Sequence, residues 1–183
     1  MKRKTAMKYT KKQLSTIAYL TSIGDKTRLA AYKQRIADRE KAKKEAREKR
    51  KADVAKIAAT VKVGDVFRCS WGYEQTNVDF FQVIAKIGKS SVRVRQVEPL
   101  MVADEAVGPM AANREYEIPA NGELLPASAY SVFIQDQNNG DLKRVDGYIG
   151  NDGSTRIAIK LRSYAYAYRE QPGTVRCYES WYA

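Results

Sequence analysis

The sequence predicts an α+β protein in which a basic N-terminal helical arm, residues 1–60, precedes a small antiparallel β domain, residues 61–183. Two observations support this prediction. The excess positive charge is confined to the first third, because residues 1–60 hold 19 Lys+Arg and 6 Asp+Glu, whereas residues 61–183 hold 14 and 15. The spacing of apolar residues also changes at about residue 63, from the helical period of about 3.6 to the strand period of about 2.

The start of the arm carries the signals of two consecutive helices. Thr10 and Gln13 have the spacing of a capping box, in which each side chain bonds the backbone N–H of the other residue. Gly24 suits the left-handed conformation that ends many helices, so a first helix is expected over residues 11–23. A second helix is expected over residues 26–60, because that stretch contains neither Gly nor Pro.

The second predicted helix has large apolar residues only near its two ends. One stripe can pack on the first helix and the other on the β domain; they are Leu29, Tyr32 and Ile36, and Val54, Ile57 and Val61. Between them, residues 37–53 contain no large apolar side chain, so this stretch cannot bury a face in a core. A coiled coil is not expected. A helix-turn-helix would need a third packed helix, which the sequence does not show.

The polar stretch of the second helix is strongly basic. Its candidate nucleic-acid-binding residues are Arg39, Lys41, Lys43, Lys44, Arg47, Lys49, Arg50 and Lys51. A phosphate backbone, of RNA or DNA, is the expected partner, because each Lys or Arg placed against a phosphate releases a condensed counterion. An acidic protein surface, an anionic membrane surface and plain solvent around a spacer helix are the alternatives.

Residues 61–183 predict one antiparallel β domain. Strands are expected where apolar residues alternate or Val, Ile and Phe cluster, at residues 66–71, 78–87, 91–97, 130–135, 142–149, 156–160 and 175–181. The opening Val63-Gly64-Asp65-Val66-Phe67, followed by a hairpin, is typical of SH3-like barrels. Strong turn signals follow at Asn138-Asn139-Gly140 and Asn151-Asp152-Gly153.

Four prolines punctuate an acidic stretch in the middle of this domain. They are Pro99, Pro109, Pro119 and Pro126. Because proline interrupts both helices and central strands, a loop insertion is expected at about residues 98–128.

Aromatic and amide side chains gather at the first expected strand-to-strand connection. Trp71 and Tyr73 offer ring faces beside Gln75 and Asn77, so this connection could stack a base and read its edge. The structural alternative is the stronger one. Trp71 shares a strand face with expected core residues, so its ring is expected to pack in the core. The turn-forming residues that follow commonly use their side chains to hydrogen-bond nearby backbone groups. Asp79 is expected to be a buried hydrogen-bond acceptor that holds the connection.

Three tyrosines alternate with alanine near the C-terminus. Ser163 can cap a short helix through residues 164–168. On a strand, instead, Tyr164, Tyr166 and Tyr168 would fall on one face and form a stacking surface. Either arrangement also suits a protein–protein interface, where tyrosine is common.

The composition argues against an enzyme. The chain has no His and two Cys, Cys69 and Cys177, so it lacks imidazole bases and the donors of a zinc site. Glu74 and Asp79 could hold Mg²⁺ for phosphodiester cleavage, but carboxylates at this spacing are common by chance. No catalytic residue, metal or cofactor is therefore expected. No apolar run approaches the roughly 18 residues of a membrane span, so no membrane association is expected.

Residues 70–83, Ser-Trp-Gly-Tyr-Glu-Gln-Thr-Asn-Val-Asp-Phe-Phe-Gln-Val, resemble a family of small proteins encoded by phages and plasmids. Lys143-Arg144-Val145 and residues 163–168 are also similar to that family, whereas residues 169–173 replace its usual closing segment. The resemblance implies an accessory protein of a mobile genetic element in a bacterial cytoplasm, and a role in countering host defence is one expectation that it raises. It supplies no reaction and no catalytic residues.

The sequence as a whole predicts a non-enzymatic binding protein. The basic arm is expected to contact nucleic acid, and an anti-CRISPR-like inhibitor of a host defence ribonucleoprotein fits this prediction. The alternative is a protein-interaction module that binds an acidic surface through the arm and the aromatic β face. A metal-dependent nuclease is a third hypothesis, and the sequence does not indicate an oligomeric state.

Overall fold

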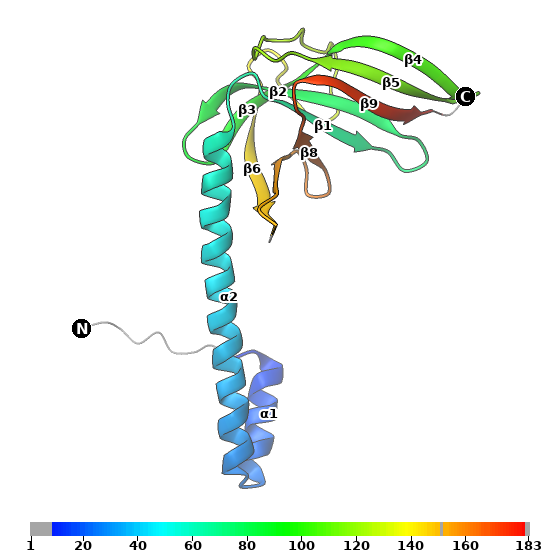
Figure 1. Ribbon diagram of the computed structural model, residues 1–183. Helices are drawn as coiled ribbons and strands as arrows, with labels where there is room; N and C mark the ends of the chain where they lie inside the picture. Colours follow the sequence, from blue (N-terminus) through cyan, green and yellow to red (C-terminus); the bar gives the residue numbers. More distant parts are fainter. Residues whose placement is uncertain (1–8, 151, 182–183) are drawn as a thin grey trace. The chain divides into compact units, whose positions relative to one another are not determined.

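The computed structural model describes residues 9–150 and 152–181, and over these residues two helices precede nine β-strands (Figure 1). The helices are α1 (Lys11–Ser22) and α2 (Lys26–Thr60). The strands are β1 (Val66–Trp71), β2 (Asn77–Ile87), β3 (Ser91–Val97), β4 (Leu100–Gly108), β5 (Ala111–Ile118), β6 (Asp141–Ile149), β7 (Thr155–Lys160), β8 (Tyr166–Arg169) and β9 (Gly173–Ser180). The chain forms two compact units, one ending at Lys49 and one beginning at Arg50. The predicted α+β class is confirmed.

Local signals set the boundary between the two helices. The Gln13 N–H donates to Thr10 Oγ1 at 3.3 Å and the Thr10 N–H donates to Gln13 Oε1 at 2.7 Å, which confirms the predicted capping box. Gly24 has a φ of 71°, the left-handed conformation expected where α1 ends. Asp25 begins α2, since its carboxylate accepts a hydrogen bond from the Arg28 backbone N–H at 2.9 Å.

The first apolar stripe of α2 is covered within the helical unit. Ile36 is buried, and Leu29 and Tyr32 are half-buried. The burial of Ile36 agrees with a packing role for this stripe. That the first helix, α1, is the element that covers it stays a prediction.

Six strands form a closed barrel in the order β1-β2-β3-β6-β7-β8, and every pair is antiparallel. The barrel closes between β1 and β8, where Arg68 lies opposite Tyr168. The predicted meander of β1, β2 and β3 is confirmed, as is the β6–β7 hairpin, in which Ile149 lies opposite Thr155. Of the turn signal between these last two strands, Asn151 lies outside the described residues.

Alternate side chains of the barrel strands fill one core. Phe67 of β1 lies opposite Phe81 of β2, and both are 0% exposed. The end of α2 contributes to the same core, because Ile57, Ala58 and Val61 are each 1% exposed and pack with these strands. Burying each large apolar side chain contributes about 1.5–3 kcal/mol. The second predicted stripe of α2 therefore packs on the body, as expected.

A second sheet, in the order β4-β5-β9, corrects the predicted loop insertion at residues 98–128. β4 and β5 occupy most of that segment, and β9, a predicted strand, pairs with β5. The prolines bound these strands instead of excluding them, since Pro99 precedes β4, Pro109 lies in the turn and Pro119 follows β5. This sheet shares a second core with β1, β2 and β3, formed by Val66, Phe80, Val97, Ile118 and Cys177.

The strand predicted at residues 130–135 is wrong. This segment forms bends, because polar side chains take the backbone N–H groups that a strand would pair. Ser131 Oγ accepts from the Ile134 N–H at 3.0 Å, and the Asp141 carboxylate accepts from the N–H groups of Gln135 and Asp136 at 3.2 Å each. The turn at residues 138–140 consequently leads into β6 without forming a hairpin.

The short helix predicted from Ser163 is also wrong. Residues 166–169 form β8, which pairs with β7 on one side and with β1 on the other. Closing the barrel requires a strand at this position, so tertiary pairing overrides the local helix signal. Of the two interpretations of the tyrosine repeat, a helix or a strand, the strand is the one observed for residues 166–169.

Candidate nucleic-acid interface

The middle of α2 is exposed on all sides. Every residue from 38 to 52 is exposed, and we call this stretch the basic segment. It holds all eight cations predicted to bind nucleic acid: Arg39, Lys41, Lys43, Lys44, Arg47, Lys49, Arg50 and Lys51. The absence of large apolar residues explains the exposure, since this part of the helix has nothing to bury.

Carboxylates neutralise part of the basic segment. Lys43 Nζ lies 3.0 Å from Glu40 Oε1, and Lys41 Nζ lies 4.0 Å from Glu45 Oε1. These pairs are exposed on both sides, where an ion pair contributes less than about 1 kcal/mol. Over the described part of the chain, four cations of the segment have no carboxylate within 4.0 Å; they are Arg39, Lys44, Arg47 and Lys49.

Most of the charge lies on one side of the helix. At about 100° per residue, six of the eight cations fall within a sector of about 140°. They are Arg39, Lys43, Lys44, Arg47, Arg50 and Lys51. One carboxylate, that of Glu40, falls in the same sector, and it is the partner of Lys43. The basic segment thus presents a broad band of positive charge along one side of α2, about 18 Å long at 1.5 Å per residue.

Trp71 has a structural role in the β body. Its ring meets Phe133 edge to face with centroids 5.5 Å apart, and its Nε1 donates to Asp79 Oδ2 at 2.6 Å. The other Asp79 oxygen accepts from Gln96 Nε2 at 2.9 Å. Burial raises the pKa of Asp79, while the hydrogen bonds from Trp71 and Gln96 act in the opposite direction. The predicted acceptor role of Asp79 is confirmed.

The turn after β1 leaves one predicted interface residue in solvent. Tyr73 is 99% exposed. Gln75 Nε2 donates to Asn77 Oδ1 at 3.3 Å, and the Thr76 N–H donates to Ser180 Oγ at 2.9 Å. The amide groups expected to read a base edge therefore bond each other, and Tyr73 is the predicted interface residue of this turn that remains open to a partner.

Replacing Gly72 by alanine is expected to lower the free energy of unfolding by about 2–4 kcal/mol, because backbone strain and a steric clash add together. Gly72 has a φ of 125°, and an added Cβ would lie 2.0 Å from the Gln75 carbonyl oxygen. Gly88 is the matched control, since it has a φ of 64° with nothing within 4 Å of an added Cβ. Gly88→Ala should cost about 1 kcal/mol. Urea unfolding of both variants checks this, and equal losses would contradict it.

Two of the three predicted C-terminal tyrosines share a strand face. Ala167 is buried in the barrel core, so Tyr166 and Tyr168 on either side of it point outward from β8. Lys160 Nζ lies 5.8 Å from the Tyr166 ring centroid, and Arg156 Cζ lies 5.6 Å from that of Tyr168. Tyr164 precedes the strand and is 81% exposed. The predicted common face thus holds for Tyr166 and Tyr168.

The two thiols are poor nucleophiles in this fold. Burial raises the pKa of Cys69 to about 11, with the Asp79 carboxylate adding to the effect. Burial also raises the pKa of Cys177, although the Arg68 guanidinium acts in the opposite direction. Both thiols are therefore protonated at neutral pH, and the thiolate is the reactive form. Within residues 9–150 and 152–181, no three Asp, Glu, Cys or His side chains cluster as metal ligands would.

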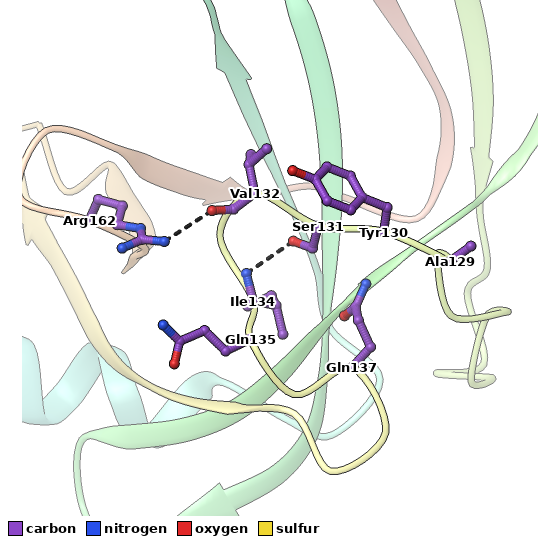
Figure 2. Close-up of a pocket in the computed structure, with 8 residues that line it drawn as sticks. All are labelled: Ala129, Tyr130, Ser131, Val132, Ile134, Gln135, Gln137 and Arg162. Carbon is purple, nitrogen blue, oxygen red and sulfur yellow. Dashed lines mark hydrogen bonds between the residues drawn. The ribbon is translucent and has the colours of Figure 1, made fainter.

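A pocket of about 570 Å³ lies beside the irregular segment before β6 (Figure 2). Its lining is Ala129, Tyr130, Ser131, Val132, Ile134, Gln135, Gln137 and Arg162. Arg162 Nη2 donates to the Val132 carbonyl at 3.0 Å, as Figure 2 shows. Gln137 Nε2 donates to the Ser128 carbonyl at 3.0 Å. The eight lining residues include no carboxylate or thiol, and their hydrogen bonds fix the local backbone.

Comparison with protein-family models, with curated proteins and with solved structures finds no match to this chain. Neither described helix has an apolar stretch long enough to cross a membrane.

Proposed function

We propose that this chain is a non-enzymatic nucleic-acid-binding protein whose basic segment lies along a phosphate backbone. The observation that supports the proposal is the set of six cations within one sector of α2, in which Lys43 pairs with Glu40 and Arg50 pairs with Asp146. Phosphates of one strand follow each other along a line, so a straight helix can contact several of them. A helix kept only as a solvated spacer would need no such one-sided charge.

The resemblance of residues 70–83 supports a wider context for this activity. In our proposal the protein acts in a bacterial cytoplasm as an accessory protein of a mobile genetic element, and its barrel is of the SH3-like type. Its target is the RNA or DNA of a host defence ribonucleoprotein, which it inhibits in the manner of an anti-CRISPR protein. The body would then dock on the protein part of that complex.

A salt series tests the nucleic-acid contact. Binding of the full chain to labelled single- and double-stranded RNA and DNA is measured by fluorescence anisotropy from low to high salt. If six cations meet phosphates, the slope of log affinity against log salt should approach about −4 for single strands and about −5 for duplexes. A flat slope, or no binding at physiological salt, would contradict the proposal.

A protein-interaction module is the second candidate function, and the edge strand β4 is the observation that favours it. β4 lies at the edge of its sheet, and all of its residues are exposed. Leu100, Met101, Val102 and Val107 are its large apolar side chains, each 47–64% exposed. An open apolar edge can accept a partner strand. Such binding would depend little on salt, so the same series separates the two functions.

A further inference from the structure

The outward side of β6, β7 and β8 gathers three tyrosines and three cations. Val145, Ile159 and Ala167 of these strands belong to the barrel core, so the alternate residues point outward. We call this outward set the tyrosine face; it consists of Arg144, Tyr148, Arg156, Lys160, Tyr166 and Tyr168.

The strand register places rings and cations next to each other on the tyrosine face. Lys160 of β7 lies opposite Arg144 of β6 on one side and opposite Tyr166 of β8 on the other. Arg156 lies opposite Tyr148, and its guanidinium is also the group near the Tyr168 ring. Tyr148 is 55% exposed and Tyr168 45%, so both rings remain open to a ligand.

The tyrosine face carries a net positive charge. Arg144, Arg156 and Lys160 are exposed, and within the described residues none of them has a carboxylate within 4.0 Å. The acidic residue on the outward side of these strands is Asp146, which lies opposite the buried Ala158. Arg50 neutralises it, since its Nη2 lies 3.2 Å from Asp146 Oδ2. An anionic ligand would therefore meet three cations and no uncompensated carboxylate.

We propose that the tyrosine face binds single-stranded nucleic acid, with bases stacked on the tyrosine rings and phosphates against the three cations. This inference rests on the proposed function, because the ligand is of the same class as the one assigned to α2. The rings determine the preference for single strands, since stacking needs an uncovered base face and a duplex keeps its bases covered. A purely cationic face would not make that distinction.

The test removes both β8 rings from the full chain by Tyr166→Thr and Tyr168→Thr, because threonine keeps the preference for a strand. Affinity for a labelled oligouridylate is expected to fall at least about 25-fold, as each base stacked on a ring contributes about fivefold or more. Affinity for a duplex should change less than about twofold. Tyr178→Thr is the matched control, since Tyr178 lies on β9 and is 53% exposed; it should bind as the wild type does.

A second variant and a crosslink keep the test decisive if the double variant folds poorly. Arg156→Gln with Lys160→Gln should lower the salt slope for the single strand by about 1.4, because two phosphate contacts are lost. An oligonucleotide that carries 5-iodouridine should photo-crosslink to Tyr166 or Tyr168, located by mass spectrometry. Unchanged single-strand affinity in both variants, or crosslinks confined to other residues, would overturn the inference.

The outcomes also separate this inference from the proposed function. If the tyrosine variants bind normally and neutralising the basic segment abolishes binding, the inference fails and the function of α2 stands. If the tyrosine variants lose single-strand binding and the basic segment proves dispensable, the tyrosine face is the binding site and the role of α2 fails. If the wild type binds no single strand, the inference is wrong whatever α2 does.

Discussion

Neutralising four cations of the basic segment is expected to lower nucleic-acid affinity on the order of a thousandfold at 0.1 M salt. The variant combines Arg39→Gln, Lys44→Gln, Arg47→Gln and Lys49→Gln, the cations without a carboxylate partner in the described chain. Each phosphate contact on a duplex adds about 0.9 to the steepness of log affinity against log salt concentration. Its contribution to the affinity is therefore nearly tenfold larger at 0.1 M salt than at 1 M. Fluorescence anisotropy across a salt series measures both the affinity and the change of slope. Glutamine keeps the helix preference, so the fold of α2 should not change.

A control with the same change of net charge separates local contact from general attraction. It combines Lys11→Gln, Lys56→Gln, Lys62→Gln and Lys89→Gln, four exposed cations outside the basic segment. If the basic segment lies on the phosphates, the control should lose only a few-fold in affinity through weaker long-range attraction. Equal losses in the two variants would show that the basic segment makes no specific contact. Retained affinity in the first variant would refute the role of α2 directly.

Replacing Gln82 by leucine is expected to lower the free energy of unfolding by about 3–5 kcal/mol, because three backbone groups lose their hydrogen-bond partner at once. Gln82 is 0% exposed. Its Nε2 donates to the carbonyls of Gly64 at 3.1 Å and Glu123 at 2.6 Å, and its Oε1 accepts from the Leu125 N–H at 2.9 Å. Leucine fills a similar volume, so the loss reports the hydrogen bonds more than a cavity.

Urea unfolding followed by circular dichroism measures this loss, with Gln171→Leu as the control. Gln171 is exposed, so the same chemical change there should shift the unfolding free energy by less than about 0.5 kcal/mol. The segment around Glu123 and Leu125 should also become sensitive to proteases in the Gln82 variant, since these bonds hold it to β2. An unfolding midpoint equal to that of the wild type would contradict the structural role of Gln82.

The parts of the fold that depend on local signals could be predicted from the sequence. The capping box of Thr10 and the glycine at position 24 act within a few residues, so the start of α1 was predicted correctly and its end to within one residue. β4 was missed because all nine of its residues are exposed, which leaves no alternation of buried and exposed positions to recognise. β8 was missed because its pairing with β1 joins residues about a hundred positions apart.

The candidate site divides in the same way. The exposed cations of α2 were predictable, because a helix without apolar residues cannot bury a face. The structural role of Trp71 was only partly predictable, since its partner Phe133 comes from a segment that the sequence assigns to a strand. Tyr148, Arg156 and Lys160 were not singled out, because their proximity to the C-terminal tyrosines follows from the strand register. The one available sequence signal was that Arg156, Ala158 and Lys160 alternate with isoleucines, which places both cations on the same face of a strand.

The entry of α2 into the barrel core couples the folding of its last turns to the folding of the sheet. Ile57 and Ala58 are buried in the barrel core, so these turns of α2 cannot unfold without exposing part of that core to water. Amide hydrogens near residues 57–60 should then exchange only when the whole barrel opens, whereas those near residues 40–48 can exchange through local fraying. A shortened chain that begins at Val61 would lack part of its own core. A chain that begins at Arg50 keeps that core and removes most of the basic segment.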